Sequence, residues 1–232
     1  MILLKRVKKS NINFKKIIIV LAIILFVVLL IFYYRSINVK NIYVTGNKLV
    51  KESDILKETN LLEYPKLYQV NENDIKESLK GNVLINNVKV TKKLSGKVII
   101  EISENKVLYQ GPDNTYMLSN KKEVELETNL LGIPTLINNA SNVEDKLIDK
   151  MLLIDDDILK HISEIEYKPA DLDKERFMFY MSDGNYVYIT LNKITLINSY
   201  NEIYPTLEGK KGILYLDSGN HFEIKEKKTA NE

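Results

Sequence analysis

The stretch VKNIYVTGNKLVKESDILKETNL, residues 39–61, decides the first part of the fold. Ile42 and Val44 alternate with Tyr43 and Thr45, and this period of two predicts a strand that is buried on one face. Gly46-Asn47 then predicts a turn, because this dipeptide tolerates the backbone angles that tight turns need. The segment after the turn changes to a helical pattern, so a strand and a helix form one small unit.

Two short helices are predicted after this turn. Ile55 and Leu56 suit the first helix, which we expect Ser53 or a residue just before it to cap. In the second helix, Asn71 is the expected N-cap, with Asp74 at the third helical position. Both helices therefore have an apolar side that needs a partner surface.

Two further strands complete a module of about seventy residues. They run over 83–92 and 97–103, with the turn KLSGK between them. Val98, Ile100 and Ile102 fall on one face of the second strand. The order strand, helix, helix, strand, strand lets a three-stranded sheet bury one face under two helices, which predicts an α+β module.

A long apolar run precedes this module. The segment IIIVLAIILFVVLLIFYY, Ile17 to Tyr34, has no charged residue and would span roughly 27 Å as a helix, against about 30 Å for a bilayer's hydrocarbon core. A cleaved signal peptide is the alternative, but such segments have about 7–15 apolar residues, and no small-x-small site precedes Ser36. The residues predicted to anchor the chain in the membrane are Ile17, Leu21, Leu25, Leu29, Phe32, Tyr33 and Tyr34.

The charges orient this span. Residues 1–16 hold six basic side chains and no acidic one, whereas the other 27 basic residues of the chain face 31 acidic ones. Because positive flanks stay inside, residues 1–16 are predicted to be cytoplasmic and residues 35–232 to lie outside the cell membrane. The outer part is acidic overall, which argues against nucleic-acid binding.

The rest of the outer part reads as a mixed, β-rich unit. Short strands are predicted at 107–109 and 115–118, and the clearest hairpin is 176–191, with Asp183-Gly184 at its turn. A strand, a Ser-Gly-Asn turn and a last short strand close the chain over 210–224. One helix is expected to be capped by Asn142 with Asp145, and its predicted buried face consists of Leu147, Ile148, Met151 and Leu152.

The sequence carries no pattern of catalytic or cofactor chemistry. It has no cysteine, which excludes disulfides, thiolate metal sites and cysteine catalysis. Its two histidines, His161 and His221, are predicted to lie at a charged helix end and in a surface strand. The residues around its serines do not match the motif of a nucleophilic serine, and the sequence has no nucleotide-binding loop. We therefore expect no enzyme activity, no cofactor and no metal.

Three phrases and their order resemble the DivIB/FtsQ family of bacterial cell division proteins. INVKNIYVTGNKLVKESDI (37–55) directly follows a basic tail and a single span, and SDGNYVYI (182–189) and KGILYLDSGNHFEI (211–224) follow later. The family's proline before the third strand is replaced here by the turn 93–96. The resemblance implies a basic cytoplasmic tail (1–16), a transmembrane helix (17–34), a POTRA domain (36–104), a β domain (105–224) and a polar tail (225–232).

The resemblance also implies a function and partners. It implies a non-enzymatic scaffold at the division septum that binds DivIC/FtsB-like and FtsL-like single-span coiled-coil proteins and, directly or indirectly, septal wall-synthesis enzymes. A strand that reaches a sheet edge late in the chain suits this role, because its open edge invites strand addition. The residues given the partner-binding role by resemblance are Ile213, Leu214, Tyr215, Leu216, Asp217, Ser218, Gly219 and Phe222.

Three alternatives stay open. The same residues would also be needed simply to close the β domain, and a POTRA-bearing export or envelope-assembly chaperone would share the anchor and the first module. A glycan-binding wall protein would use an exposed aromatic platform. A second open edge is expected at 39–45, with Asn47 and Lys48 exposed in the turn beside it.

Overall fold

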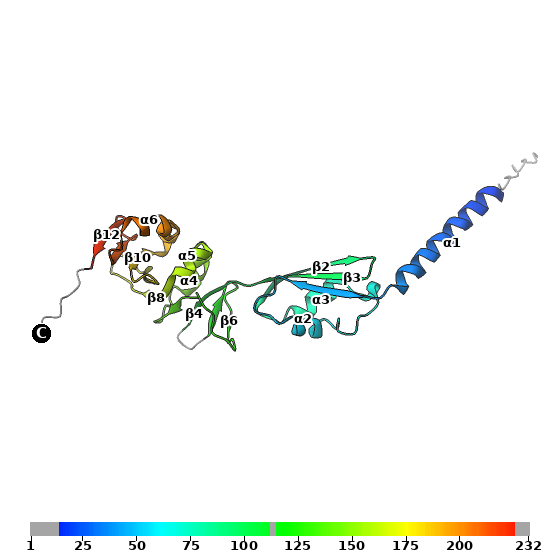
Figure 1. Ribbon diagram of the computed structural model, residues 1–232, viewed down its shortest axis with the longest axis horizontal. Helices are drawn as coiled ribbons and strands as arrows, with labels where there is room; N and C mark the ends of the chain where they lie inside the picture. Colours follow the sequence, from blue (N-terminus) through cyan, green and yellow to red (C-terminus); the bar gives the residue numbers. More distant parts are fainter. Residues whose placement is uncertain (1–13, 112–114, 226–232) are drawn as a thin grey trace, which may run out of the picture. The chain divides into compact units, whose positions relative to one another are not determined.

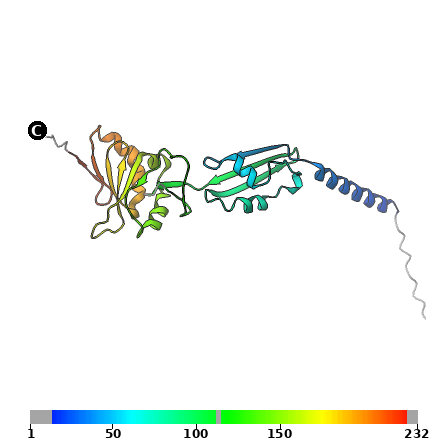
Figure 2. The same cartoon turned by 90° about the horizontal axis from the view of Figure 1, so that it is seen from below.

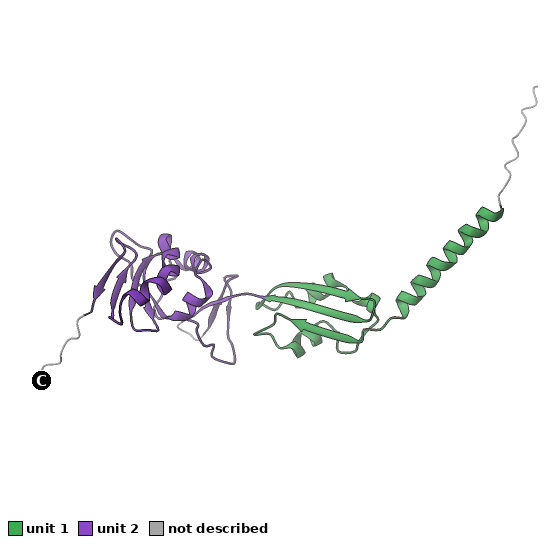
Figure 3. Ribbon diagram, turned by 45° about the horizontal axis from the view of Figure 1, so that its top comes forward, with its two compact units in different colours: residues 1–103 green, residues 104–232 purple. Residues whose placement is uncertain are grey.

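The computed structural model describes residues 14–111 and 115–225. The chain divides into two compact units, Met1–Ser103 and Glu104–Glu232 (Figure 3). Most of the predicted tails at 1–16 and 225–232 lies outside the described residues. Each unit has a hydrophobic core of its own.

The first unit starts with a long exposed helix. Helix α1 (Phe14–Ser36) contains the predicted span 17–34, and its length and composition would let it cross a membrane. The predicted anchor residues lie on this helix, and Tyr34 near its end is half-buried against the core that follows. The remaining elements of this unit are β1 (Asn41–Thr45), α2 (Glu52–Glu58), the 3-10 turn η1 (Leu67–Gln69), α3 (Glu72–Leu79), β2 (Ile85–Lys93) and β3 (Lys97–Glu104).

The three strands form one sheet in the order β1-β3-β2, with α2 and α3 on one side of it (Figure 1). β1 and β3 run parallel, from Asn41 opposite Lys97 to Thr45 opposite Glu101. The core beneath the helices contains Ile55, Ile75, Leu79, Val98, Ile100 and Ile102. The predicted strand-helix-helix-strand-strand order is therefore confirmed.

The two helix caps of this module differ. Asn71 caps α3 as predicted, because its side-chain oxygen accepts a hydrogen bond from the Asn73 N–H at 3.1 Å. For α2 the predicted cap is Ser53 or a residue just before it, and the structure has Lys51 at the N-cap position, without a side-chain bond, and Ser53 inside the helix. The Ser53 hydroxyl instead bonds the neighbouring Asp54 carboxylate at 3.3 Å.

The second unit is built on a nine-stranded sheet in the order β12-β11-β10-β9-β8-β7-β4-β5-β6. Figure 2 shows these strands as arrows. Its strands are β4 (Val107–Gln110), β5 (Tyr116–Leu118), β6 (Glu123–Val124), β7 (Thr135–Leu136), β8 (Ile162–Tyr167), β9 (Arg176–Met181), β10 (Tyr186–Thr190), β11 (Gly212–Tyr215) and β12 (His221–Ile224). Its helices are α4 (Glu144–Met151), α5 (Asp156–His161), the 3-10 segment η2 (Leu191–Ser199) and α6 (Tyr200–Thr206).

The two faces of this sheet differ in composition. Phe177 and Phe179 on β9 and Val187 and Ile189 on β10 are fully buried, and they join one core with residues of α4, α5, η2 and α6. The alternate positions of these strands include the half-buried Tyr180, Tyr186 and Tyr188. The hairpin predicted at Asp183-Gly184 is confirmed, since β9 and β10 pair antiparallel around it.

The predictions for α4 need two corrections. Asn142 does not cap it, because the helix begins at Glu144 and its N-cap residue is Val143 without a side-chain bond. Leu147, Ile148 and Met151 are buried as predicted, but Leu152 is 42% exposed. Leu152 follows the last residue of the helix, so the helical periodicity no longer fixes its direction. The predicted α+β fold class itself is confirmed.

Candidate partner-binding edge

The predicted partner-binding residues lie partly inside the sheet and partly at its surface. β11 lies inside the sheet, parallel to β10 on one side and antiparallel to β12 on the other. Leu214 and Leu216 are buried and belong to the core, whereas Ser218 and Gly219 are exposed in the turn. The strand that forms the sheet edge is therefore β12, and β11 supports it.

β12 presents an open backbone edge. Within the described part of the chain, no strand pairs with the side of β12 that faces away from β11. The Lys225 N–H bonds the Lys211 carbonyl at 3.0 Å, and Gly212 lies opposite Ile224. Since inward and outward groups alternate along an antiparallel strand, the N–H and C=O groups of Phe222 and Ile224 point outward. Two residues of β12 thus carry the groups that a further strand would bind.

A close approach at Gly212 holds β12 against the sheet. A Cβ atom at this position would lie 2.0 Å from the Glu223 carbonyl oxygen and 2.8 Å from the Phe222 ring. Real Cβ atoms do not come this close to backbone, so only glycine allows the two strands to pair here. Phe222 is half-buried and packs against the core from this position.

The turn between β11 and β12 is held by a buried ion pair. Arg176 Nε donates to Asp217 Oδ2 at 2.6 Å, and these side chains are only 20% and 9% exposed. Lys193 Nζ also donates to the Asp217 carbonyl at 2.7 Å, and the Leu216 N–H donates to the Tyr188 carbonyl at 2.8 Å. These bonds tie the turn to β9, β10 and η2, so the start of β12 is fixed from three sides.

Stacked side chains continue this support across the outer face of the sheet. The Arg176 guanidinium lies 3.7 Å from the Tyr188 ring centroid, and Tyr188 stacks on Tyr215 at 5.4 Å. Tyr215 in turn stacks on His221 at 4.6 Å. The Tyr215 hydroxyl donates to Glu223 at 3.0 Å, and burial together with this bond raises the pKa of Tyr215. Cross-strand stacking of this kind stabilises neighbouring strands.

A polar network fixes the other end of β11. Asn185 is 1% exposed, and its side-chain oxygen accepts a hydrogen bond from the Gly212 N–H at 3.0 Å. Its amide group donates to the Tyr200 hydroxyl at 3.1 Å, which donates to Asp183 at 2.8 Å. Burial and the Asp183 carboxylate both raise the pKa of Tyr200. The hairpin turn, α6 and β11 are therefore linked through one buried amide.

Sequence reasoning missed three contributors to this edge. Glu223 and Ile224 lie on the edge strand itself, and Ile224 is 54% exposed. Arg176 is remote in sequence from Asp217, and nothing in the local pattern links the two. The alternation in KGILYLDSGNHFEI marks two strands, but only the tertiary pairing shows which of them is outermost.

Among the strands that the structure describes, β1 pairs with β3 alone, so the first unit has an open edge of its own on the other side of β1. Lys48 is exposed in the following turn, and Asn47 is half-buried with its side chain donating to the Val50 carbonyl at 3.0 Å. This bond gives Asn47 a structural role. The β1 edge is five residues long, one more than β12.

Comparisons with known proteins give a family model for the first module and relatives over most of the chain. Residues 37–105 match the family model described as POTRA domain, FtsQ-type. The cell division protein DivIB of Listeria monocytogenes is 28% identical over 215 residues, covering 82% of this chain and 80% of the relative. DivIB of Bacillus subtilis is 24% identical over 196 residues, covering 80% and 73%. The major extracytoplasmic domain of DivIB from Geobacillus stearothermophilus matches with 23% identity and a TM-score of 0.38, covering 46% of this chain and 96% of that one.

Proposed function

Because the chain belongs to the DivIB/FtsQ family of cell division proteins, we propose that it is a non-enzymatic scaffold of the bacterial division complex. Helix α1 anchors it in the cell membrane with the N-terminus in the cytoplasm, and residues 35–232 lie outside. The protein gathers at the division septum and promotes assembly of the complex there. It contacts the septal wall-synthesis enzymes directly or through its other partners.

The open edge of β12 is the observation that carries this proposal. A partner segment in extended conformation adds to the sheet by bonding the outward N–H and C=O groups of Phe222 and Ile224. The exposed turn residues Ser218 and Gly219 flank the same edge, whereas the buried Leu214 and Leu216 hold it in place from behind. The partners are DivIC/FtsB-like and FtsL-like single-span coiled-coil proteins.

The shared membrane strengthens such an interaction. An edge of four residues offers few backbone bonds, so the affinity of the isolated strands is modest. Partners that are anchored in one bilayer meet at a raised effective concentration, which increases the occupancy without any new contact. Strand addition at a short edge is therefore sufficient for a scaffold that works at the membrane surface.

The test is the localisation of a fluorescent fusion, joined to the cytoplasmic N-terminus, in dividing cells that carry Ile224→Pro. Proline removes the outward N–H of residue 224 and no bond to β11, and edge strands tolerate it on that side. We expect the parent protein to form a band at mid-cell and the proline variant to lose the band at an unchanged protein level.

Ile224→Ala is the matched control, because it shortens the same side chain and keeps the N–H. Its band should persist. Equal bands for both variants would contradict strand addition at β12. A uniform membrane signal of the parent protein throughout division would contradict the division role and favour the export-chaperone alternative.

A further inference from the structure

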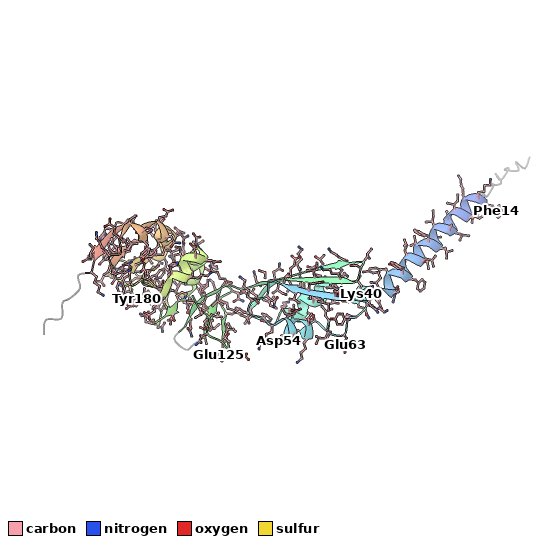
Figure 4. The ribbon with its side chains drawn as sticks, in the orientation of Figure 1. Phe14, Lys40, Asp54, Glu63, Glu125 and Tyr180 are labelled. Carbon is pink, nitrogen blue, oxygen red and sulfur yellow. The ribbon has the colours of Figure 1, made fainter. Side chains whose placement is uncertain are left out.

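Three chain segments meet at one end of the POTRA domain, and together they form what we call the proximal end: residues 35–41, 60–70 and 92–97. The Val39 N–H donates to the Pro65 carbonyl at 2.9 Å, and the Leu67 N–H donates to the Ile37 carbonyl at 2.9 Å. The Lys40 N–H donates to the Gly96 carbonyl at 2.8 Å. Figure 4 shows Lys40 and Glu63 at this same end of the domain, with Asp54 further along it.

The proximal end begins at the last turn of α1 without a linker. Tyr34 of α1 is half-buried against the POTRA core. The Arg35 guanidinium carbon lies 4.9 Å from the centroid of the Tyr68 ring, and Lys66 Nζ donates to the Ser36 carbonyl at 3.4 Å. When α1 spans a bilayer, these contacts keep the loops of the proximal end at the level of the lipid headgroups.

This end also carries the exposed apolar side chains of the domain. Leu62 is 54% exposed, Tyr64 52% and Leu94 67%, and Tyr68 is exposed beside them. Tyr43 is the one other large apolar side chain that is exposed among the described residues after α1 in this unit. Lys97 Nζ lies 4.0 Å from the centroid of its ring. Exposed leucine and tyrosine side chains that gather at one end of a domain are typical of an interaction surface.

The proximal end is also more basic than the opposite end of the domain. The proximal end has one acidic residue, Glu63, and six basic residues: Arg35, Lys40, Lys66, Lys92, Lys93 and Lys97. The opposite end, residues 45–52, 80–85 and 101–104, has three basic and three acidic residues. No large apolar side chain of those ranges is exposed. Basic charge and exposed apolar groups therefore coincide at the end next to the anchor and nowhere at the other.

We propose that the proximal end is a second membrane-binding surface, which lies on the outer leaflet and binds anionic phospholipid. Leu62, Tyr64 and Leu94 enter the boundary between headgroups and acyl chains, where tyrosine and leucine are favoured. The lysines around them bind lipid phosphate. The surface fixes the orientation of the POTRA domain to the bilayer, which a single helix alone does not do. This inference rests on the proposed membrane anchor α1.

The absence of tryptophan from the chain gives a direct test. The full chain carrying Tyr64→Trp is reconstituted in vesicles of phosphatidylglycerol and phosphatidylcholine, some with brominated acyl chains. We expect a blue-shifted emission and a loss of intensity with the brominated lipid. The matched control is Lys48→Trp at the opposite end of the same domain, which is tethered to the same anchor and should be neither shifted nor quenched.

Charge reversal separates lipid binding from mere proximity to the anchor. In the Tyr64→Trp background, Lys40→Glu and Lys93→Glu together should reverse the blue shift and the quenching. The same number of reversals at the opposite end, Lys48→Glu and Lys80→Glu, should leave both unchanged. Circular dichroism of each variant shows whether the fold is kept.

Four outcomes would overturn the proposal. The first is equal emission from positions 64 and 48. The second is emission that does not depend on lipid composition although the vesicles retain the chain. Either result would contradict the lipid-binding surface and leave the proposed scaffold role untouched. The third is release of the parent chain from vesicles by alkaline carbonate. This result would contradict the role of α1 as a membrane anchor, on which the proposed scaffold function also depends. A blue shift that needs a second protein assigns the proximal end to protein docking instead.

Discussion

Gly212→Ala is expected to displace β12 from the sheet. The added methyl group would lie 2.0 Å from the Glu223 carbonyl oxygen. This oxygen belongs to the backbone, so it cannot move aside as the end of a flexible side chain could. Overpacking costs about 1–3 kcal/mol of stability when the core adjusts, and here the only adjustment is to separate the two strands. Hydrogen exchange should show lost protection of β12 amides, and the mid-cell band that we propose for the parent protein should disappear.

Gly81→Ala is the matched control for this change. Nothing lies within 4 Å of a Cβ atom at Gly81, and its φ is not positive. The free energy of unfolding of that variant should stay within about 0.5 kcal/mol of the parent value. A Gly212→Ala protein with β12 amides as protected as in the parent would contradict the close packing of the two strands.

Arg176→Ala should cost about 3 kcal/mol in the free energy of unfolding of the second unit. It leaves the Asp217 carboxylate, which is 9% exposed, without its guanidinium partner and removes the stacking on Tyr188. The lower end of the range for buried ion pairs applies, because Arg176 itself is one-fifth exposed. Denaturant titration measures the loss, and the turn at 216–220 should gain mobility.

Two comparisons sharpen this result. Lys89→Ala removes a surface pair, Lys89–Glu101, whose side chains are 64% and 47% exposed, and it should cost less than about 1 kcal/mol. Arg176→Ala combined with Asp217→Asn should recover part of the stability, because the buried charge is removed together with its partner. A single variant no more costly than Lys89→Ala would contradict the role of the ion pair.

Local signals in the sequence predicted most of the first module and the anchor. The alternation at Ile42 and Val44, the Asn71 cap and the charge-free run 17–34 each depend on neighbouring residues alone, and the structure has elements at all three places. The exact N-cap of α2 was not predicted, because several polar residues lie near the start of this helix and the local sequence does not show which of them takes the cap position. The N-cap residue is Lys51, two positions before Ser53.

The candidate edge was only partly predictable for a different reason. Sequence reasoning placed the partner-binding role on 213–219 and Phe222, in the right closing segment, but β11 pairs in parallel with β10 across the η2–α6 crossover and becomes an inner strand. Parallel pairing between distant segments leaves no local pattern. The contact between Arg176 and Asp217 has the same origin, since it joins residues that are 41 positions apart.

Backbone amide exchange in the full chain, with and without the proposed DivIC-like partner in the same bilayer, tests strand addition at β12 most directly. The account predicts that the partner slows exchange at Phe222 and Ile224, whose N–H groups point outward, and leaves Glu223, already bonded to β11, nearly unchanged. This alternation along one strand is specific to pairing at the edge. A partner that binds while the exchange of Phe222 and Ile224 stays as fast as in the free protein would contradict the account.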